Sequence, residues 1–385
     1  MAWHQNRHLS PFNSSLIFVF LLIFVSIIAG CRSAPTGSPP PQSPSPTSGP
    51  PLKGKVSLFT LPMAGSSSPA IITGPDGNAW FTEVSGTTNG PSSKIGRITP
   101  SGKISEFPPN ALHGNLGSIT VGPDGNLWFT DGGFSQGGKI GSITPTGAIK
   151  EFPLPASPAD PISITTGADG NLWFTDGLPS QIARIERITP TGAIKVFPLP
   201  PSDSPDGITA GPDGNLWFTE TIIGPKVINS PGPNGQIGRI TPAGKISTYR
   251  LLSGGVPSHI TMGPDHNLWF SEEVAANRSL PVNKIGRITP AGTITEFALP
   301  PGNSQGSMGL PVGIASGADG YLWFTDAAGN AIGRITTTGT IGEFALPTPQ
   351  SLPVNIAYAS GGTLWFTEQG VNDQTGKIGK LTIVT

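Results

Sequence analysis

The feature that most constrains this chain is a five-residue pattern, Leu-Trp-Phe-Thr followed by an acid, which returns along most of its length. The tryptophans of this pattern are Trp80, Trp128, Trp173, Trp217, Trp269, Trp323 and Trp365. Only Ala79 and Ser271 depart from it, and successive copies lie 42 to 54 residues apart. That period is close to the length of four short strands with their turns. Because so small a unit cannot bury its apolar face alone, the repeat predicts stacked copies around a continuous core.

Each copy has the same internal plan, which is clearest around Trp217. An apolar segment, residues 206–210, leads into the turn Gly-Pro-Asp-Gly-Asn and then into the Trp strand. Residues 237–241 read Ile-Gly-Arg-Ile-Thr, and a second tight turn leads to a fourth segment, residues 245–249. In such turns proline presets one φ angle and glycine accepts a positive one. The sequence therefore predicts an all-β fold, a seven-bladed β-propeller of four-stranded antiparallel blades.

The number of strands also predicts how the ring closes. The last copy ends with residues 378–382, Ile-Gly-Lys-Leu-Thr, and no fourth strand follows. Residues 54–62, before the first copy, match the fourth-strand pattern of residues 102–108. We expect this N-terminal strand to complete the last blade and so to remove exposed sheet edges. The tryptophans are expected to form the core between neighbouring sheets, since each ring buries on the order of 200 Å².

The first 52 residues differ from the repeats. Residues 1–31 contain an apolar run, Leu16–Ala29, which is short for a spanning helix but suits a signal peptide. It is followed by Gly and Cys31, a pattern that resembles the bacterial lipobox, whose cysteine becomes the lipidated N-terminus. Residues 32–52 are rich in Pro, Ser and Gly, as in a solvated tether. An uncleaved signal anchor is the alternative.

These features divide the chain into a lipoprotein signal peptide, a linker and a propeller domain over residues 53–385. We expect the domain to be held outside the cytoplasmic membrane, which it would contact through the lipid anchor. The formal net charge is −1 and only 12% of residues are charged, so no basic surface for a nucleic acid is expected. We expect a monomer whose ligand is a small molecule or a component of the cell envelope.

Topology divides the predicted propeller into two faces. In an antiparallel meander, the turns after the first and third strands lie at one end, and here those turns are uniform. The loops at the opposite end vary, and the longest insertion is Thr221–Gly235 in the fourth copy. Function on a rigid scaffold is usually carried by variable loops. We therefore expect the site on that face, around the mouth of a central channel.

An acid ends every Trp strand on the variable face. These acids are Glu83, Asp131, Asp176, Glu220, Glu272, Asp326 and Glu368. A ring of carboxylates suggests a cation site, but an acid repeated in every blade more often caps loop amides or pairs with a repeated base. The third-strand bases are Arg97, Arg187, Arg239, Arg287 and Arg334. We expect these acids to be structural.

Histidines that break the repeat are more informative. Beyond the signal peptide they are His113, His259 and His266, of which His266 replaces glycine in a turn of the uniform face. His259 begins an innermost strand, and Glu272 and Glu273 end the next one. An imidazole with a near-neutral pKa beside carboxylates predicts a catalytic group, and a hydrogen-bonded wall residue is the alternative. The residues expected to contact a ligand on this face are Glu220, Asn355, Glu368 and Gln369.

Three longer motifs recur in a constant order: Gly-Pro-Asp-Gly-Asn-Leu-Trp-Phe-Thr-Glu, Lys-Ile-Gly-Arg-Ile-Thr-Pro and Glu-Phe-x-Leu-Pro. Through them, residues 53–385 closely resemble the virginiamycin B lyases, also called streptogramin B lyases. The resemblance implies an elimination that opens the ester of a cyclic depsipeptide antibiotic. A histidine would take the proton, and Mg²⁺ would stabilise the enolate-like charge.

This chain departs from the family at the residues that carry this chemistry. In the family, the last two blades begin with Pro-His-Ala-Ile and Glu-Pro-His-Gly-Ile, and a glutamate lies four residues after the final tryptophan. The corresponding residues here are Val312, Leu352, Val354 and Gln369. Valine can neither accept a proton nor bind Mg²⁺. We therefore expect a binding module, for which no definite cofactor is implied. The first alternative is a lyase that uses displaced residues and Mg²⁺. The second alternative is a structural or adhesive protein.

Overall fold

The computed structural model shows an all-β protein built from seven sheets. It describes residues 47–49, 52–87, 90–107, 115–132, 137–155, 158–178, 182–222, 234–274, 283–300, 309–370 and 375–384. The signal peptide with Cys31, His113 and most of the Thr221–Gly235 insertion lie outside these ranges. None of the described segments forms a helix with the length and apolarity needed to cross a membrane.

Each sheet is one blade, and the blades are numbered along the chain. Blade 1 contains β3 (Ser66–Ser67), β4 (Ile71–Thr73), β5 (Ala79–Thr87), β6 (Gly90–Ile98) and β7 (Ile104–Phe107). Blade 2 contains β8 (Leu116–Val121), β9 (Leu127–Asp131), β10 (Lys139–Ile143) and β11 (Ile149–Pro153). Blade 3 contains β12 (Pro161–Thr166), β13 (Leu172–Leu178), β14 (Ile182–Ile188) and β15 (Ile194–Pro198).

The remaining blades follow the same order from the centre outward. Blade 4 contains β16 (Asp203–Ala210), β17 (Leu216–Ile222), β18 (Asn234–Ile240) and β19 (Ile246–Arg250). Blade 5 contains β20 (Val256–Met262), β21 (Leu268–Glu273), β22 (Lys284–Ile288) and β23 (Ile294–Ala298). Blade 6 contains β24 (Pro311–Ser316), β25 (Leu322–Asp326), β26 (Ala331–Ile335), β27 (Thr340–Ala345) and β1 (Thr47–Ser48). Blade 7 contains β28 (Pro353–Ala359), β29 (Thr363–Glu368), β30 (Lys377–Ile383) and β2 (Gly54–Thr60).

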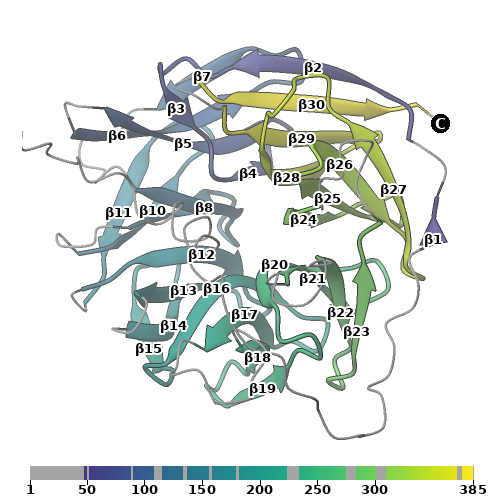
Figure 1. Cartoon of the computed structure of the whole chain (residues 1–385). Coiled ribbons are helices and arrows are strands. Elements are labelled where there is room, and N and C mark those ends of the chain that lie inside the picture. Colours follow the sequence, from purple (N-terminus) through teal and green to yellow (C-terminus); the bar gives the residue numbers. More distant parts are fainter. Residues whose placement is uncertain are drawn as a thin grey trace, which may run out of the picture. The chain divides into compact units, whose positions relative to one another are not determined.

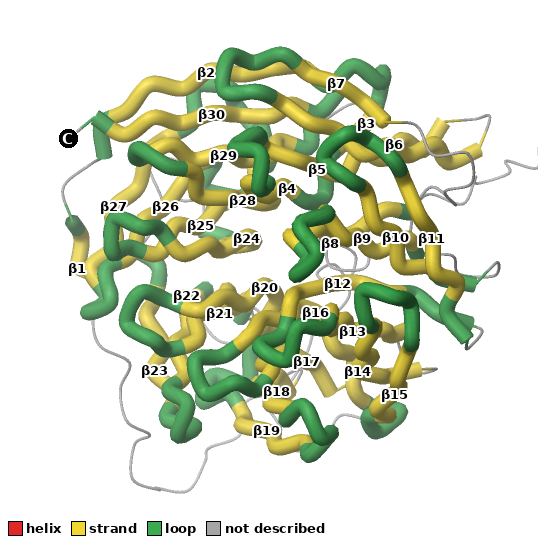
Figure 2. The backbone as a smooth tube through the Cα atoms, turned by 180° about the vertical axis from the view of Figure 1, so that it is seen from behind, coloured by secondary structure: helices red, strands yellow, loops and turns green. Residues whose placement is uncertain are grey.

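The first strands of the blades close into a ring. They contact one another in the order β4, β8, β12, β16, β20, β24 and β28, and β28 returns to contact β4. Figures 1 and 2 show these strands surrounding a common axis with the other strands outside them. The predicted seven-bladed propeller of antiparallel blades is confirmed.

The N-terminal strand closes the ring as predicted. β2 is the fourth strand of blade 7, and it pairs antiparallel with β30 from Gly54 opposite Ile383 to Thr60 opposite Lys377. In Figure 1 the purple and yellow ends of the chain therefore lie side by side. A second, shorter strand, β1, pairs in parallel with the outer edge of blade 6. Antiparallel pairing along seven residues stabilises the joint between the two ends of the domain.

The tryptophans form the core between blades, as expected. All seven are between 0% and 2% exposed. Trp128, for example, packs against Leu172 and Phe174 of the next blade, and its ring stacks on Phe152 of its own blade at 5.2 Å. Its Nε1 donates a hydrogen bond to Asp124 Oδ1 at 3.0 Å, so the only polar atom of the indole is satisfied.

A hydroxyl near the end of six of the second strands joins neighbouring blades. Thr325 Oγ1 accepts a hydrogen bond from Gly313 N of its own blade at 2.9 Å and donates to Val354 O of the next blade, also at 2.9 Å. The same pair of bonds is made by Thr82, Thr130, Thr175, Thr219 and Ser271. The pattern therefore requires a hydroxyl here, which explains why serine is accepted in blade 5.

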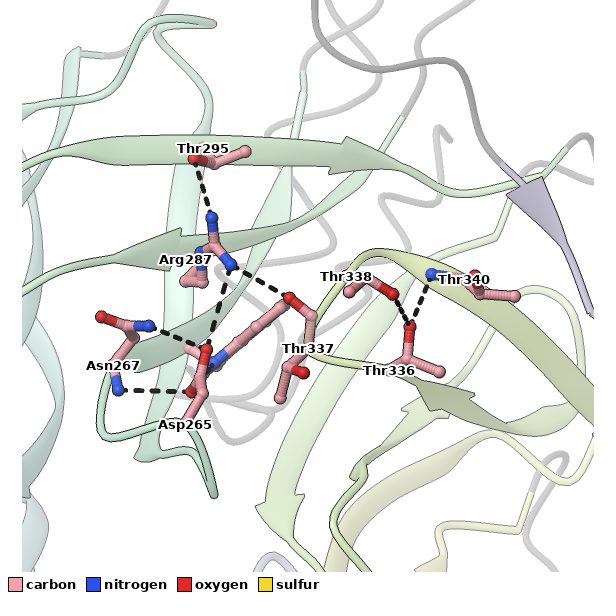
Figure 3. Close-up of polar contacts among 9 residues, drawn as sticks. Asp265, Asn267, Arg287, Thr295, Thr336, Thr337, Thr338 and Thr340 are labelled. Atoms are coloured by element: carbon pink, nitrogen blue, oxygen red, sulfur yellow. Dashed lines mark hydrogen bonds and ion pairs between the residues drawn. The ribbon is translucent and has the colours of Figure 1, made fainter.

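The expectation that the third-strand arginines pair with the acids of the variable face is wrong. Arg287 Nη1 lies 3.9 Å from Asp265 Oδ2 in a turn of the uniform face and donates to Thr337 O of blade 6 at 3.0 Å (Figure 3). The arginines that make the same contacts are Arg97, Arg187 and Arg239, while Arg334 lies over Tyr321. The reason is antiparallel register: Arg287 lies opposite Trp269, whereas Glu272 lies opposite Lys284.

Candidate functional site

Six of the seven first strands carry a β-bulge at the same place, between a proline or leucine near the start of the strand and a buried isoleucine. A bulge leaves two residues outside the regular ladder and re-aims their side chains. The bulge pairs are Gly117–Ser118, Ile162–Ser163, Asp206–Gly207, Ser258–His259, Val312–Gly313 and Val354–Asn355. The first strands surround the axis. Where the bulge pairs differ in sequence, the side chains around the axis therefore differ from blade to blade.

Four of these bulge residues form a polar chain, which we call the axial cluster: Asp206, Ser258, His259 and Asn355. His259 Nδ1 lies 3.1 Å from Ser258 Oγ, and His259 Nε2 lies 3.3 Å from Asn355 Nδ2. Ser258 also hydrogen-bonds the Asp206 carboxylate. The cluster joins blades 4, 5 and 7, and all four side chains are half-buried.

Blade 6 lies between His259 and Asn355, and it has Gly313 at the bulge position that these two residues occupy in blades 5 and 7. A Cβ atom on Gly313 would lie 2.7 Å from Val354 O and 2.9 Å from the Cα atom of Asn355. A side chain at this position would therefore collide with the neighbouring strand. The amide of Asn355 contacts His259 although blade 6 lies between their strands.

Burial sets the protonation states of the axial cluster. Burial lowers the pKa of His259, and the charge of Asp206 partly opposes this effect. Burial raises the pKa of Asp206, and the charge of His259 and the hydrogen bond from Ser258 oppose that effect. A neutral imidazole has one donor and one acceptor. Since Asn355 Nδ2 can only donate, Nε2 accepts, Nδ1 donates to Ser258, and Ser258 donates to Asp206. Both ring nitrogens of His259 are thus used within the protein.

The carboxylates predicted to act with His259 have other partners. Glu272 is buried and accepts a hydrogen bond from Ser253 Oγ. Burial, then the charge of Glu296, raise the pKa of Glu272 to about 7. The pKa of Glu273 is also raised by burial. No residue of the axial cluster is among the groups that shift the pKa values of Glu272 and Glu273. A joint catalytic role of His259, Glu272 and Glu273 therefore stays a prediction.

The predicted ligand contacts divide into two groups. Asn355 belongs to the axial cluster. Glu220 is buried and accepts a hydrogen bond from Gln236 Nε2 at 2.7 Å, while burial, then the charge of Asp203, raise the pKa of Glu220 to about 8. Glu368 is buried as well, and Gln369 donates its backbone N–H to Leu352 O. The two acids therefore lie within their blades.

Loop capping by the repeated acids is observed. Asp326 Oδ1 accepts hydrogen bonds from Leu310 N at 2.7 Å and Gly329 N at 2.8 Å, and Asp176 Oδ1 accepts one from Asp160 N at 2.7 Å. These carboxylates stabilise the ends of the second strands.

The sequence analysis did not single out Asp206 and Ser258. Both stand directly after a proline near the start of a first strand, in Pro-Asp-Gly-Ile and Pro-Ser-His-Ile. An alignment of the copies at this proline shows polar residues in blades 4 and 5 where blades 6 and 7 have Val312 and Val354. That difference between copies was the available signal.

A model of the virginiamycin B lyase family matches residues 51–223 and 181–385, which include all of the blades. The chain belongs to the virginiamycin B lyase family. Virginiamycin B lyase from Staphylococcus aureus is 34% identical, and the match covers 86% of this chain and 100% of that one with a TM-score of 0.69.

Two further structures of this family are similar. A streptogramin B lyase is 32% identical over 86% of this chain and 98% of its own, with a TM-score of 0.68. A catalytically inactive histidine-to-alanine variant of the Staphylococcus aureus lyase, solved with quinupristin, is 34% identical over 86% of this chain and 100% of its own, with a TM-score of 0.68. No curated protein sequence matches this chain.

Val312, Leu352 and Val354, which the sequence resemblance aligns with reactive positions, do not fit a Mg²⁺ ion. The carbonyl oxygens of Val312 and Val354 accept hydrogen bonds from the hydroxyls of Ser271 and Thr325, and the Leu352 carbonyl accepts one from Gln369 N. The side chains of these three residues offer no oxygen or nitrogen ligand, and the fourth position, Gln369, offers only a neutral amide. Within the described ranges, no three His, Cys, Asp or Glu side chains gather where they could hold a metal ion.

Proposed function

We propose that this member of the virginiamycin B lyase family binds a small-molecule or cell-envelope ligand at the axial cluster without eliminating it. The observation that carries the proposal is that both nitrogens of His259 are hydrogen-bonded, to Ser258 and to Asn355. A general base needs a free lone pair within reach of the proton that it removes. In this chain, Asn355 takes up the lone pair of Nε2.

The ring of bulge residues suggests the chemistry of the ligand. Blades 4 and 5 contribute Asp206, Ser258 and His259, whereas blades 6 and 7 contribute the half-exposed Val312 and Val354. Ligand sites usually combine apolar walls with a few well-placed polar groups. An amphipathic molecule with an apolar body and several amide or ester groups would match both halves. Quinupristin, found with the Staphylococcus aureus variant, is therefore a suitable probe.

Titration of the full chain with quinupristin in a calorimeter, with Mg²⁺ present, tests the proposal. We expect saturable binding that His259→Phe and Asn355→Ala each weaken about tenfold, the equivalent of about 1.4 kcal/mol. Glu220→Gln, a conservative change of a buried acid outside the cluster, should bind as the unmodified protein does. Absence of binding by the unmodified protein would contradict the proposal.

The alternative is a lyase with displaced residues, and one observation favours it. His259 is held neutral, and Ser258 connects it to Asp206, so a ligand that displaced Asn355 would meet a free Nε2 lone pair. Elimination leaves the mass of quinupristin unchanged, so the reaction must be followed by chromatographic shift and by the reactivity of the new alkene. We expect no product; turnover that His259→Ala abolishes would establish the lyase instead.

We further propose that the protein is a lipid-anchored, extracytoplasmic monomer that binds no nucleic acid. Support comes from the apolar run Leu16–Ala29 before Cys31, from the Pro- and Ser-rich linker, and from the net charge of −1. In cells fed a labelled fatty acid, the label should appear on the protein, and Cys31→Ser should abolish it. A label retained by Cys31→Ser would contradict the anchor.

A further inference from the structure

The formal net charge of −1 hides a separation of charge between the two faces of the propeller. On the variable face, the acids that end the second strands are all buried. On the uniform face, exposed lysines stand at the beginning of the fourth strands of several blades. We call these lysines the basic arc: Lys53, Lys55, Lys103, Lys150, Lys195 and Lys245. The uniform face thus gathers exposed positive charge.

The aspartates of the uniform face do not offset these lysines. Asp265 accepts hydrogen bonds from Trp269 Nε1 at 2.9 Å and from Asn267 Nδ2 at 2.8 Å. Arg287 Nη1 lies 3.9 Å from the same carboxylate, and the aspartate side chain is only 18% exposed (Figure 3). The indole of the same blade donates in this way to Asp76, Asp124, Asp169, Asp213 and Asp319. In the part of the chain that the structure describes, no lysine of the basic arc forms an ion pair within 4.0 Å.

The basic arc follows the rim of the uniform face. Lys103 and Lys245 each close a turn of this face, through a backbone hydrogen bond of 3.0 Å to their carbonyl oxygen. Lys150 Nζ lies 4.6 Å from the centre of the Phe152 ring, and this ring packs against Gly192 in the uniform-face turn of the next blade. The lysines belong to blades 7, 1, 2, 3 and 4, which follow one another around the ring. A flat surface could therefore contact all of them at once.

The chain enters the described domain at the same face. β1 lies beside β27 at the outer edge of blade 6 (Figure 1), and Thr47 stands opposite Thr340. Thr340 O accepts the backbone hydrogen bond from Thr336 N, at 2.9 Å, that closes the uniform-face turn of this blade. Because β1 and β27 are parallel, Thr47 is at the uniform-face end of the pair, whereas an antiparallel pairing would have put it nearer the variable face. The domain is therefore joined to the preceding linker on the side of the basic arc.

We propose that the uniform face docks on a bilayer that contains anionic lipids, so that the variable face and the axial cluster open away from the membrane. Lysines near an anionic bilayer each strengthen binding, and their attraction acts over about a Debye length. The basic arc supplies this charge on one face, and the linker joins the domain at that face. The inference goes beyond ligand binding at the axial cluster, and it uses the proposed anchor only to keep the chain near the membrane.

Energy transfer from a fluorophore on the full chain to a dye on the lipid headgroups tests the proposal. Cys31 is the only cysteine, so the fluorophore can be placed through Ser101→Cys in an exposed uniform-face turn or through Leu252→Cys in an exposed link of the variable face. The labelled chain without an added cysteine gives the background. With vesicles of phosphatidylcholine and about 30% phosphatidylglycerol, we expect several-fold more efficient transfer from Ser101→Cys than from Leu252→Cys. Salt at about 1 M should remove the difference because it screens the charges, and pure phosphatidylcholine vesicles should not show it.

Lys245 and Arg250 offer a matched pair of variants, because both are exposed and they stand at opposite ends of β19. Lys245→Gln should shift the docking equilibrium about fivefold towards the undocked state. Arg250→Gln removes the same charge on the variable side and should leave the equilibrium unchanged. The combined change of Lys103, Lys150, Lys195 and Lys245 to glutamine should abolish the difference in transfer between the two labels.

Three outcomes would overturn the proposal. The first is equal transfer from both labels on anionic vesicles. The second is a difference that persists on neutral vesicles or after the combined lysine change, since the linker alone would then set the orientation. The third is a difference that a short DNA duplex abolishes at equal phosphate concentration, which would indicate a nucleic-acid surface instead. Because the readout needs no ligand at the axial cluster, failure here is distinct from failure of the proposed function.

Discussion

Ser271 and the threonines at the equivalent positions of other blades each lie between two first strands. One hydrogen bond of the hydroxyl satisfies the N–H of a bulge residue in the same blade, and the other satisfies a carbonyl in the next blade. Both groups belong to bulges, where the regular ladder cannot pair them. In blades 2 to 6 one side chain therefore satisfies the bulge and connects adjacent blades. The same bulges carry the residues of the axial cluster.

Thr325→Val tests this role of the hydroxyl. Thr325 is fully buried, and valine keeps its shape while leaving Gly313 N and Val354 O without partners. We expect a loss of about 1–3 kcal/mol in the free energy of unfolding, measured by denaturant titration. Ser271→Thr is the control and should change it by less than about 0.5 kcal/mol, because threonine occupies this position in the other blades. A valine variant as stable as the unmodified protein would refute the role.

At the scale of elements, the blades are joined by strands and by side chains. β2 supplies the fourth strand of blade 7, and its Phe59 packs 6.2 Å from Trp365. On the uniform face, arginines such as Arg287 connect a turn of one blade to a carbonyl of the next (Figure 3). The arginine contacts are half-exposed and weak individually. The strand joint buries apolar surface and makes many backbone hydrogen bonds, so it should dominate closure of the ring.

Deletion of residues 53–62 should therefore destabilise the whole domain. It exposes the edge of β30 and removes Leu58 and Phe59 from the core of the last joint. We expect the melting temperature to fall sharply, as the loss is a large part of the about 5–15 kcal/mol typical of a domain. Lys55→Ala, a change of an exposed residue in the same strand, should leave it almost unaltered. An unchanged melt of the deletion variant would argue against closure by β2.

Over the whole molecule, carboxyls are buried repeatedly towards the variable face. Burial raises several of their pKa values to about 7 or about 8; these residues are Glu83, Asp160, Glu186, Glu220, Glu272 and Glu343. In most cases a second acid nearby raises the pKa further, as Asp203 does for Glu220. Between an unfolded value of about 4 and these folded values, the folded state binds more protons than the unfolded state.

The sign of this linkage predicts that stability decreases as pH rises. The free energy of unfolding should be largest near pH 5 and should fall up to about pH 8, which follows from the raised pKa values. Glu220→Gln keeps an acceptor for Gln236 and removes one of the titrations. It should therefore stabilise the protein at pH 8.5 by more than about 1 kcal/mol, with little effect at pH 5. Melting curves across this range check the prediction, and stability that rises from pH 5 to pH 8 would contradict it.

The sequence by itself determined the number of blades, their four strands, the tryptophan core and closure by the N-terminal strand. These follow from a repeat whose apolar alternation and turn residues act locally, so that each copy specifies the same meander. It also singled out His259, which breaks the repeat, and placed Asn355 among the expected ligand contacts.

Only the tertiary structure decided which groups meet. The contact of His259 with Asn355 crosses 96 residues and is made by bulge residues of two different blades, which no pattern within one copy reveals. The partners of the arginines depend likewise on register between strands and on the blade that lies next in the ring. A repeat encodes the blade through short-range chemistry, whereas a site made from several blades exists only once the ring has closed.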